Sequence, residues 1–174
     1  MNESTLTPAC LKVLLVEDCA EDAELIQELL LESRLEKSIE MTNSVRLQEA
    51  IEILKFQVFD LILLDLTLPD SDKLNTLFRL QENCGINIAI VILIATDDEE
   101  LAVELIAAGA QDYLVKKQVD SRLLVRTIRC AIARQKRQAE CQKSQQKYPQ
   151  IVDKIKEVVF ETNTNGNWTF LNPT

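Results

Sequence analysis

Three carboxylates stand where short apolar runs of the sequence end. Glu17 and Asp18 follow the first run, and Asp65 follows the third. Lys116 follows the fifth run and would bring a positive charge to the same edge of a sheet. Carboxylate oxygens suit Mg²⁺, and a cation with a lysine neutralises phosphoryl oxygens while a carboxylate acts as the nucleophile. These residues predict a magnesium site that holds a phosphoryl group. The alternative is a set of solvated acids that only cap helices.

The elements that must position these residues alternate along the first 116 residues. Runs that fit strands buried on both faces lie at residues 12–16, 38–42, 59–64, 88–95 and 112–115. Segments with apolar residues at helical spacing separate them. This alternation predicts an α/β fold, a doubly wound five-stranded parallel sheet with helices on both faces. Ligands of such sheets bind beyond the carboxyl ends of the strands.

Polar residues mark the ends of the last two predicted helices. Thr96 stands three residues before Glu99, as in a capping box, and is the predicted N-cap of one helix. Gly109 is predicted to close that helix. Asp120 is predicted to begin the next.

Composition excludes several classes of site. The 174 residues include no histidine, which removes histidine triads and histidine–metal sites. The 5 cysteines are an odd number without a Cys-x-x-Cys pair, which favours a reducing compartment. No apolar run reaches the roughly 18 residues of a membrane span, and the first ten residues do not resemble a signal peptide. The expected location is the cytoplasm, without a membrane partner.

Charge divides the chain unevenly. Residues 1–116 carry 23 acids and 8 bases, whereas residues 117–147 carry 2 acids and 9 bases. The basic segment contains no Pro or Gly from residue 120 to 147, which predicts one long helix that Pro149 ends. An apolar seam that becomes polar predicts a weak parallel homodimer through Val125, Ile128, Ile132, Gln135, Ala139 and Gln142.

Nucleic acid is not an expected partner, although residues 126–138 form a basic helical run. A solvated helix face beside a dimer seam explains this run better than a DNA-binding helix. A basic zipper would need a long zipper after it, and Pro149 intervenes. No helix-turn-helix pattern follows.

Three stretches resemble the receiver domain of two-component response regulators. They are LLVEDCAEDAELI at 14–26, FDLILLDLTLPDSD at 59–72 and AAGAQDYLVK at 107–116. The resemblance covers roughly residues 11–130 and implies a flavodoxin-like receiver fold. It also implies a histidine kinase or phosphotransfer protein as the phosphoryl donor.

The resemblance assigns a role to each residue of the site. Asp65 corresponds to the phosphorylated aspartate. Glu17 and Asp18 correspond to the acidic pair that positions Mg²⁺, together with the backbone carbonyl of Thr67. Lys116 corresponds to the lysine that contacts the phosphoryl group. Tyr113 stands at the position of the aromatic switch residue.

The sequence departs from the family at the switch. Ile94 stands where the family carries Ser or Thr, so one hydrogen bond to the phosphoryl group is lost. Thr96 is a possible substitute, although an N-cap role explains it more simply. Lys73 stands where relatives usually have Gly, and would be strained if that turn requires a positive φ.

The end of the chain predicts part of a second domain. Residues 157–162 and 168–171 have strand character and flank Asn165-Gly166, a hairpin signal. Two strands cannot form a stable unit alone, and this segment resembles the start of a PAS sensor domain. The predicted organisation is a tail at 1–10, a receiver at 11–130, a linker helix at 131–147 and a truncated PAS-like domain at 148–174.

Three functions remain in competition at this point. The first is a receiver that relays phosphorylation of Asp65 through the linker helix to a PAS-containing output. The second is a degenerate receiver that acts as an interaction module without phosphorylation, since Ile94 replaces the switch residue. The third is a phosphohydrolase, but such enzymes need a second acid two residues after the nucleophile, where this chain has Thr67.

Overall fold

A computed structural model describes residues 10–33, 39–83, 88–95, 98–152, 160–162 and 168–171. The chain divides into two compact units, Met1–Gln135 and Lys136–Thr174. The elements are β1 (Leu11–Val16), α1 (Ala20–Glu32), β2 (Ile39–Ser44), α2 (Leu47–Phe56), β3 (Leu61–Asp65), α3 (Lys73–Asn83), β4 (Ala89–Ile94), α4 (Glu99–Ala107), β5 (Asp112–Val115), α5 (Ser121–Val152), β6 (Phe160–Thr162) and β7 (Trp168–Leu171).

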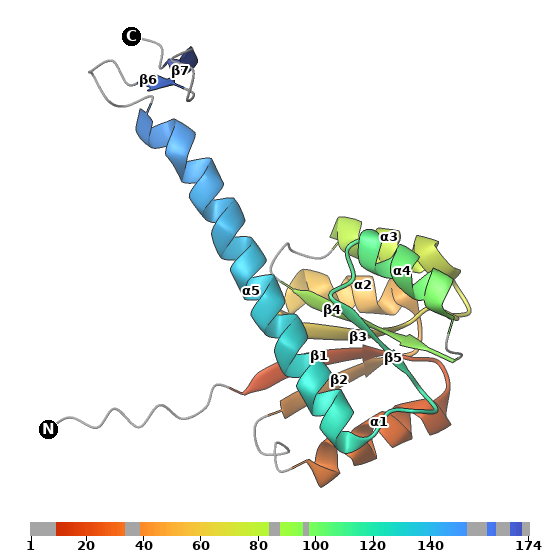
Figure 1. Cartoon of the computed structure of the whole chain (residues 1–174). Coiled ribbons are helices and arrows are strands. Elements are labelled where there is room, and N and C mark those ends of the chain that lie inside the picture. Colours follow the sequence, from red (N-terminus) through yellow and green to blue (C-terminus); the bar gives the residue numbers. More distant parts are fainter. Residues whose placement is uncertain are drawn as a thin grey trace, which may run out of the picture. The chain divides into compact units, whose positions relative to one another are not determined.

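The first unit is a doubly wound sheet, as the sequence predicts. Its strand order is β2-β1-β3-β4-β5, and every neighbouring pair is parallel (Figure 1). All residues of β3 and β4 are buried, which explains their continuous apolar sequence. The order reverses between β1 and β3, so the carboxyl ends of these two strands form the expected place for a ligand.

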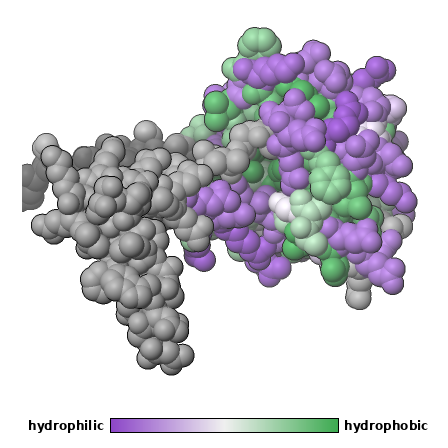
Figure 2. All heavy atoms as spheres, turned by 90° about the horizontal axis from the view of Figure 1, so that it is seen from above, coloured by the Kyte–Doolittle hydropathy of each residue, from purple (hydrophilic) through white to green (hydrophobic). Residues whose placement is uncertain are grey.

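A hydrophobic core lies on each face of the sheet. One cluster joins alternate strand residues to α2, α3 and α4 through side chains such as Leu47, Leu77 and Leu105. The other joins the remaining strand residues to α1 and to the first part of α5, through Ile26 and Leu124 among others. Figure 2 shows the molecule from above relative to Figure 1. The coloured surface is mainly hydrophilic, with some hydrophobic side chains among the polar ones.

The helix ends of α4 and α5 confirm two predictions and correct one. The Asp98 side chain accepts a hydrogen bond from Leu101 N–H, so Asp98 is the N-cap of α4 and the predicted Thr96 is not. Asp98 can make this bond because the helix begins two residues later than the capping-box pattern indicates. Gly109 ends α4 with φ +104°, as predicted, and Asp120 caps α5 through Leu123 N–H.

The long helix differs from its prediction in two ways. It continues through Pro149 to Val152, because a proline removes one backbone donor without always ending a helix. Part of its predicted dimer seam is also used inside the first unit. Ile128 is 1% exposed in the core and Ile132 packs against the same cluster, while Gln135 accepts a hydrogen bond from Gln111. These three residues are therefore not free to form a seam, whereas Val125 is half-buried and the role of Ala139 stays a prediction.

The second unit contains a short hairpin. β6 and β7 pair antiparallel, with Phe160 opposite Leu171. This confirms the predicted pairing, and the Asn165-Gly166 turn lies outside the described residues. Among the residues that the structure describes, no helix combines the length and apolar character of a membrane span.

Candidate functional site

Three acids meet at the carboxyl edge of the sheet, as predicted. β1 and β3 are neighbours in register, with Val16 beside Leu64, so the residues that follow lie next to one another. Glu17, Asp18 and Asp65 each bring a carboxylate oxygen within 4.8 Å of the others. Glu17 and Asp65 are each only 3% exposed, whereas Asp18 is exposed. The oxygen donors and their spacing fit a magnesium ion.

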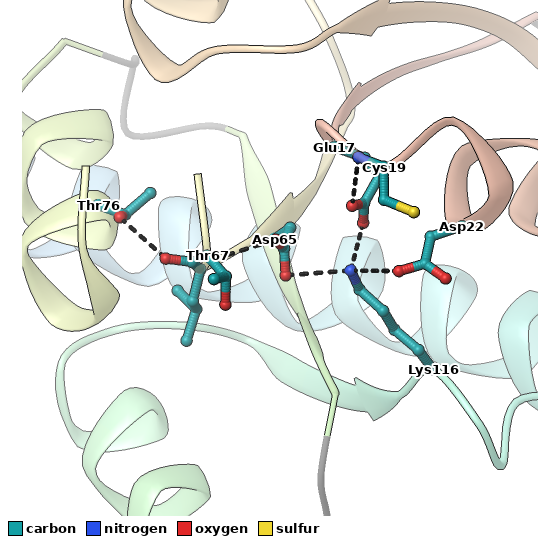
Figure 3. A network of polar contacts seen from close by, with 8 residues as sticks. Glu17, Cys19, Asp22, Asp65, Thr67, Thr76 and Lys116 are labelled. Carbon is teal, nitrogen blue, oxygen red and sulfur yellow. Dashed lines mark hydrogen bonds and ion pairs between the residues drawn. The ribbon is translucent and has the colours of Figure 1, made fainter. Parts of the chain in front are cut away.

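Lys116 extends from the end of β5 into this acidic cluster (Figure 3). Its Nζ lies 2.6 Å from Glu17 Oε2 and 3.2 Å from Asp65 Oδ1. It also lies 2.8 Å from Asp22 Oδ2, a contact that was not predicted from the sequence. Asp22 is in the first turn of α1, and Asp18 lies before the N-cap Cys19, so no helical spacing of the sequence marks this contact.

Burial and charge shift two pKa values in this cluster. Burial is the main reason that the pKa of Glu17 is raised, and the nearby charge of Asp65 adds to it, although the hydrogen bond with Lys116 opposes both. Burial alone would lower the pKa of Lys116, but its contacts with Asp22, Glu17 and Asp65 outweigh burial and raise it. Lys116 is therefore a permanent cation at neutral pH.

Both oxygens of the Asp65 carboxylate are engaged. Oδ1 faces the Lys116 ammonium at 3.2 Å, and Oδ2 accepts a hydrogen bond from Thr67 N–H at 3.1 Å. Glu17 is oriented in a similar way, because its Oε1 accepts from Cys19 N–H at 3.2 Å. The sequence also predicts that the backbone carbonyl of Thr67 contacts the metal, and this contact stays a prediction.

The loop after β3 is anchored to two helices. The Asp70 carboxylate accepts hydrogen bonds from the backbone N–H groups of Leu47 and Gln48, at 3.0 and 2.9 Å, at the start of α2. Arg79 of α3 donates to the Asp70 carbonyl. Lys73 has φ +42°, which confirms the strain expected from a residue other than glycine at this turn. These anchors hold the chain that follows Asp65 in one place.

The predicted switch residues lie on one face of the sheet. Ile94 ends β4 and is 4% exposed in the core cluster beneath α2, α3 and α4. Tyr113 of β5 is half-buried and packs against the same cluster. No hydroxyl is available from the Ile94 side chain. Thr96 lies outside the described residues.

A doubly wound sheet with a partly buried acid cluster and a lysine at its carboxyl edge defines a receiver-type α/β domain. The chain belongs to the response regulator receiver domain family, whose model matches residues 13–129. Proteins of this family act in two-component signalling, and accepting a phosphoryl group is general for them.

Relatives with known names support this membership. The chain is 32% identical over 130 residues to the cell cycle transcriptional regulator CtrA of Caulobacter vibrioides, covering 75% of this chain and 54% of that protein. It is 26% identical over 113 residues to the chemotaxis protein CheY of Thermotoga maritima, covering 65% of this chain and 91% of that protein. The chain thus spans about half the length of CtrA, the longer of these two relatives.

Solved structures share the fold. The receiver domain of the Francisella response regulator 1452 superimposes with a TM-score of 0.60 at 27% identity, covering 71% of this chain and 98% of that one. The phosphorylated cyanobacterial phytochrome response regulator RcpA gives a TM-score of 0.56 at 28% identity, covering 69% and 90%.

Proposed function

We propose that this chain accepts a phosphoryl group on Asp65 from a histidine kinase or phosphotransfer protein. A lone pair of one Asp65 oxygen would attack phosphorus as the bond from phosphorus to the donor's imidazole nitrogen breaks. The electron pair of that bond leaves with the imidazole, and Asp65 becomes an acyl phosphate. The observation that carries this proposal is a buried Asp65 carboxylate 3.2 Å from the Lys116 ammonium.

The residues around Asp65 have complementary tasks. Thr67 N–H holds one carboxylate oxygen and so orients the other. Lys116 supplies a fixed positive charge for the phosphoryl oxygens. Glu17 and Asp18, with Asp65, would hold Mg²⁺. That ion, when bound, neutralises negative charge as the phosphoryl group approaches.

The signal would leave the receiver through α5. We propose that residues 148–174 begin a PAS sensor domain, because β6 and β7 form the antiparallel hairpin that this resemblance implies. A weak parallel homodimer through α5 stays part of this proposal, and Val125 and Ala139 are the seam residues that the core of the first unit does not use. Sedimentation of the chain at high concentration tests the dimer, and a monomer there would remove it.

A second candidate follows from Ile94. Its side chain is buried in the core and cannot hydrogen-bond a phosphoryl group. A receiver with this residue could bind its partners in one shape whether or not it is phosphorylated. The acid site is intact, so phosphorylation without a large change of shape is the version we favour.

The test is intact-mass measurement after incubation with Mg²⁺ and acetyl phosphate. We expect the protein mass to increase by one phosphoryl group. No increase is expected when Mg²⁺ is chelated before acetyl phosphate is added. The matched variant Asp65→Asn keeps the shape of the side chain and should take up none. Unmodified wild-type protein under all these conditions would refute the proposed function and leave the interaction module.

A further inference from the structure

We propose that Asp22 is a positioning residue that tethers the ammonium of Lys116 beside Asp65, so that an oxygen of Asp65 can be released for attack while Lys116 stays at the site. This inference rests on the proposed function. It gives α1 a role in the proposed phosphoryl transfer through Asp22, which is neither a predicted metal ligand nor the phosphoryl acceptor.

The contact of Asp22 is short and comes from a separate element. Asp22 Oδ2 lies 2.8 Å from Lys116 Nζ, whereas Asp65 Oδ1 lies 3.2 Å from the same nitrogen (Figure 3). Asp22 belongs to the first turn of α1, and the other two acids of Lys116 follow or end strands. Lys116 is therefore drawn toward α1 as well as toward the acceptor.

The acceptor needs such a tether because neither of its oxygens is free. Asp65 Oδ2 accepts from Thr67 N–H, and Oδ1 faces Lys116. A carboxylate oxygen that is paired to an ammonium has a stabilised lone pair and is a weaker nucleophile. Any contact that holds Lys116 back from Oδ1 leaves this oxygen more reactive.

Glu17 cannot fill this role when the site is loaded. It is the closest acid to Lys116, at 2.6 Å, but it is also one of the three predicted metal ligands. A cation would compete with Lys116 for its oxygens. Asp22 lies outside the three-acid metal set and keeps its carboxylate for Lys116.

The charge of Asp22 matters to Lys116 in the absence of metal. Asp22 and Glu17 lie 2.8 Å and 2.6 Å from the Lys116 ammonium, and of these two acids only Asp22 lies outside the predicted metal set. The side chain of Asp22 is 35% exposed and that of Lys116 is 10% exposed, so salt screens the pair only in part.

The experiment compares Asp22→Asn with Glu24→Gln. Both remove one negative charge from α1, but the Glu24 side chain is exposed and makes no ion pair or hydrogen bond among the described residues. Initial rates with acetyl phosphate are measured at saturating Mg²⁺. We expect Asp22→Asn to slow phosphorylation roughly fivefold, the upper range for a partly exposed ion pair. Glu24→Gln should match the wild type, and Asp22→Glu should recover part of the loss.

A second readout needs neither metal nor turnover. In metal-free protein labelled with ¹⁵N-lysine, the Lys116 ammonium signal should shift in Asp22→Asn and stay unchanged in Glu24→Gln. The thermal midpoint of Asp22→Asn should fall by no more than a few degrees, as expected for the loss of one partly exposed ion pair, and that of Glu24→Gln should match the wild type. Cooperative unfolding of both variants separates positioning from a loss of fold.

Each outcome decides the inference. Rates or lysine spectra of Asp22→Asn that equal those of Glu24→Gln would overturn it, as would an equal loss in Asp22→Asn and Asp22→Glu. If Asp22→Asn is slow while its lysine signal shifts, the tether is supported. Wild-type protein that takes up no phosphoryl group would instead overturn the proposed function, and this inference with it.

Discussion

Ile94 is the residue at which the sequence predicts the main departure from the receiver family. It ends β4, is 4% exposed and shares an apolar cluster with Tyr113. Ser or Thr at this position would offer a hydroxyl to the phosphoryl group, and isoleucine offers none. The proposed phosphoryl transfer would use Asp65 and Lys116, whose side chains lie 3.2 Å apart at the site. We therefore expect isoleucine at position 94 to affect the response to phosphorylation more than the transfer itself.

We predict that Ile94→Thr enlarges the structural response to phosphorylation. The wild type should show little change in amide hydrogen exchange over α4 and around Tyr113, because no side chain at position 94 follows the phosphoryl group. Ile94→Val, which stays apolar, is the matched control. A large change in the wild type would show that another residue performs the coupling.

Lys73 is a second residue that conflicts with its backbone. Its φ of +42° lies in the left-handed region, which costs a residue with a Cβ roughly 1–2 kcal/mol. We predict that Lys73→Gly raises the free energy of unfolding by about 1 kcal/mol, measured by urea denaturation. Lys55→Gly, in α2 at an ordinary φ, should lower it by about 1 kcal/mol. If Lys73→Gly and Lys55→Gly both lower the free energy of unfolding, the backbone at Lys73 is not strained.

Which site residues could be predicted depends on how each is placed. Asp65 and Lys116 stand at the ends of apolar strands, and the strand ends of a parallel sheet meet at one edge. The residue types and their positions in the sequence were therefore sufficient to predict that the two side chains meet. Asp22 reaches the site through the first turn of a helix, and Asp70 through a loop that contacts α2. Such tertiary contacts leave no periodic signal in the sequence.

At the scale of elements, α2 is capped by another part of the chain. Its own N-cap, Arg46, makes no side-chain hydrogen bond to the helix. The Asp70 carboxylate accepts hydrogen bonds from Leu47 and Gln48 N–H in its place and so joins α2 to the loop that follows β3. The stability of α2 and the position of that loop are therefore coupled.

We predict that Asp70→Ala lowers the free energy of unfolding by about 1 kcal/mol at neutral pH, the usual cost of a lost helix cap. Burial alone would raise the pKa of Asp70, but the two backbone donors outweigh it and lower the pKa below its ordinary value of 3.8. The contribution is thus present above pH 3.8 and lost as the pH falls through the lowered pKa. Urea denaturation at neutral pH and below pH 3.8 should show the difference shrink. Glu82→Ala, on the exposed face of α3, should show no such difference.

Elements were easier to predict than their ends. The five strands of the first unit follow from apolar runs, and all five exist, with β2 shifted to Ile39–Ser44. The N-cap of α4 differs because Asp98 competes with Thr96 two residues away, and both residue types are good caps. The predicted end of α5 at Pro149 was wrong. A proline weakens a helix locally, but the residues that flank it decide whether the helix continues.

At the scale of the whole receiver unit, Lys116 joins the start of α1 to two strands. Its ammonium contacts Glu17, Asp22 and Asp65, and so balances the negative charge of these acids in the absence of metal. Removing a partner from a buried charge cluster leaves the other charges uncompensated. The acidic body of residues 1–116 makes this repulsion stronger.

We predict that Lys116→Ala lowers the free energy of unfolding by roughly 3 kcal/mol without metal. Added Mg²⁺ should recover part of this loss, because binding to the folded acid cluster stabilises it by mass action. Lys117→Ala removes an exposed lysine next to it and should change little. Thermal unfolding with and without Mg²⁺ measures both effects. Equal stability of the two variants would show that Lys116 does not balance the cluster.

The most direct test of the whole account is to locate the phosphoryl group on the chain. Borohydride reduces an acyl phosphate to an alcohol and so converts the modified aspartate to homoserine. After incubation with Mg²⁺ and acetyl phosphate, peptide mass spectrometry should find homoserine at position 65 and at no other aspartate. Homoserine at Asp18, Asp22 or Asp60 instead of Asp65 would contradict the assignment of the acceptor, and with it the roles of Lys116 and Asp22 in phosphoryl transfer.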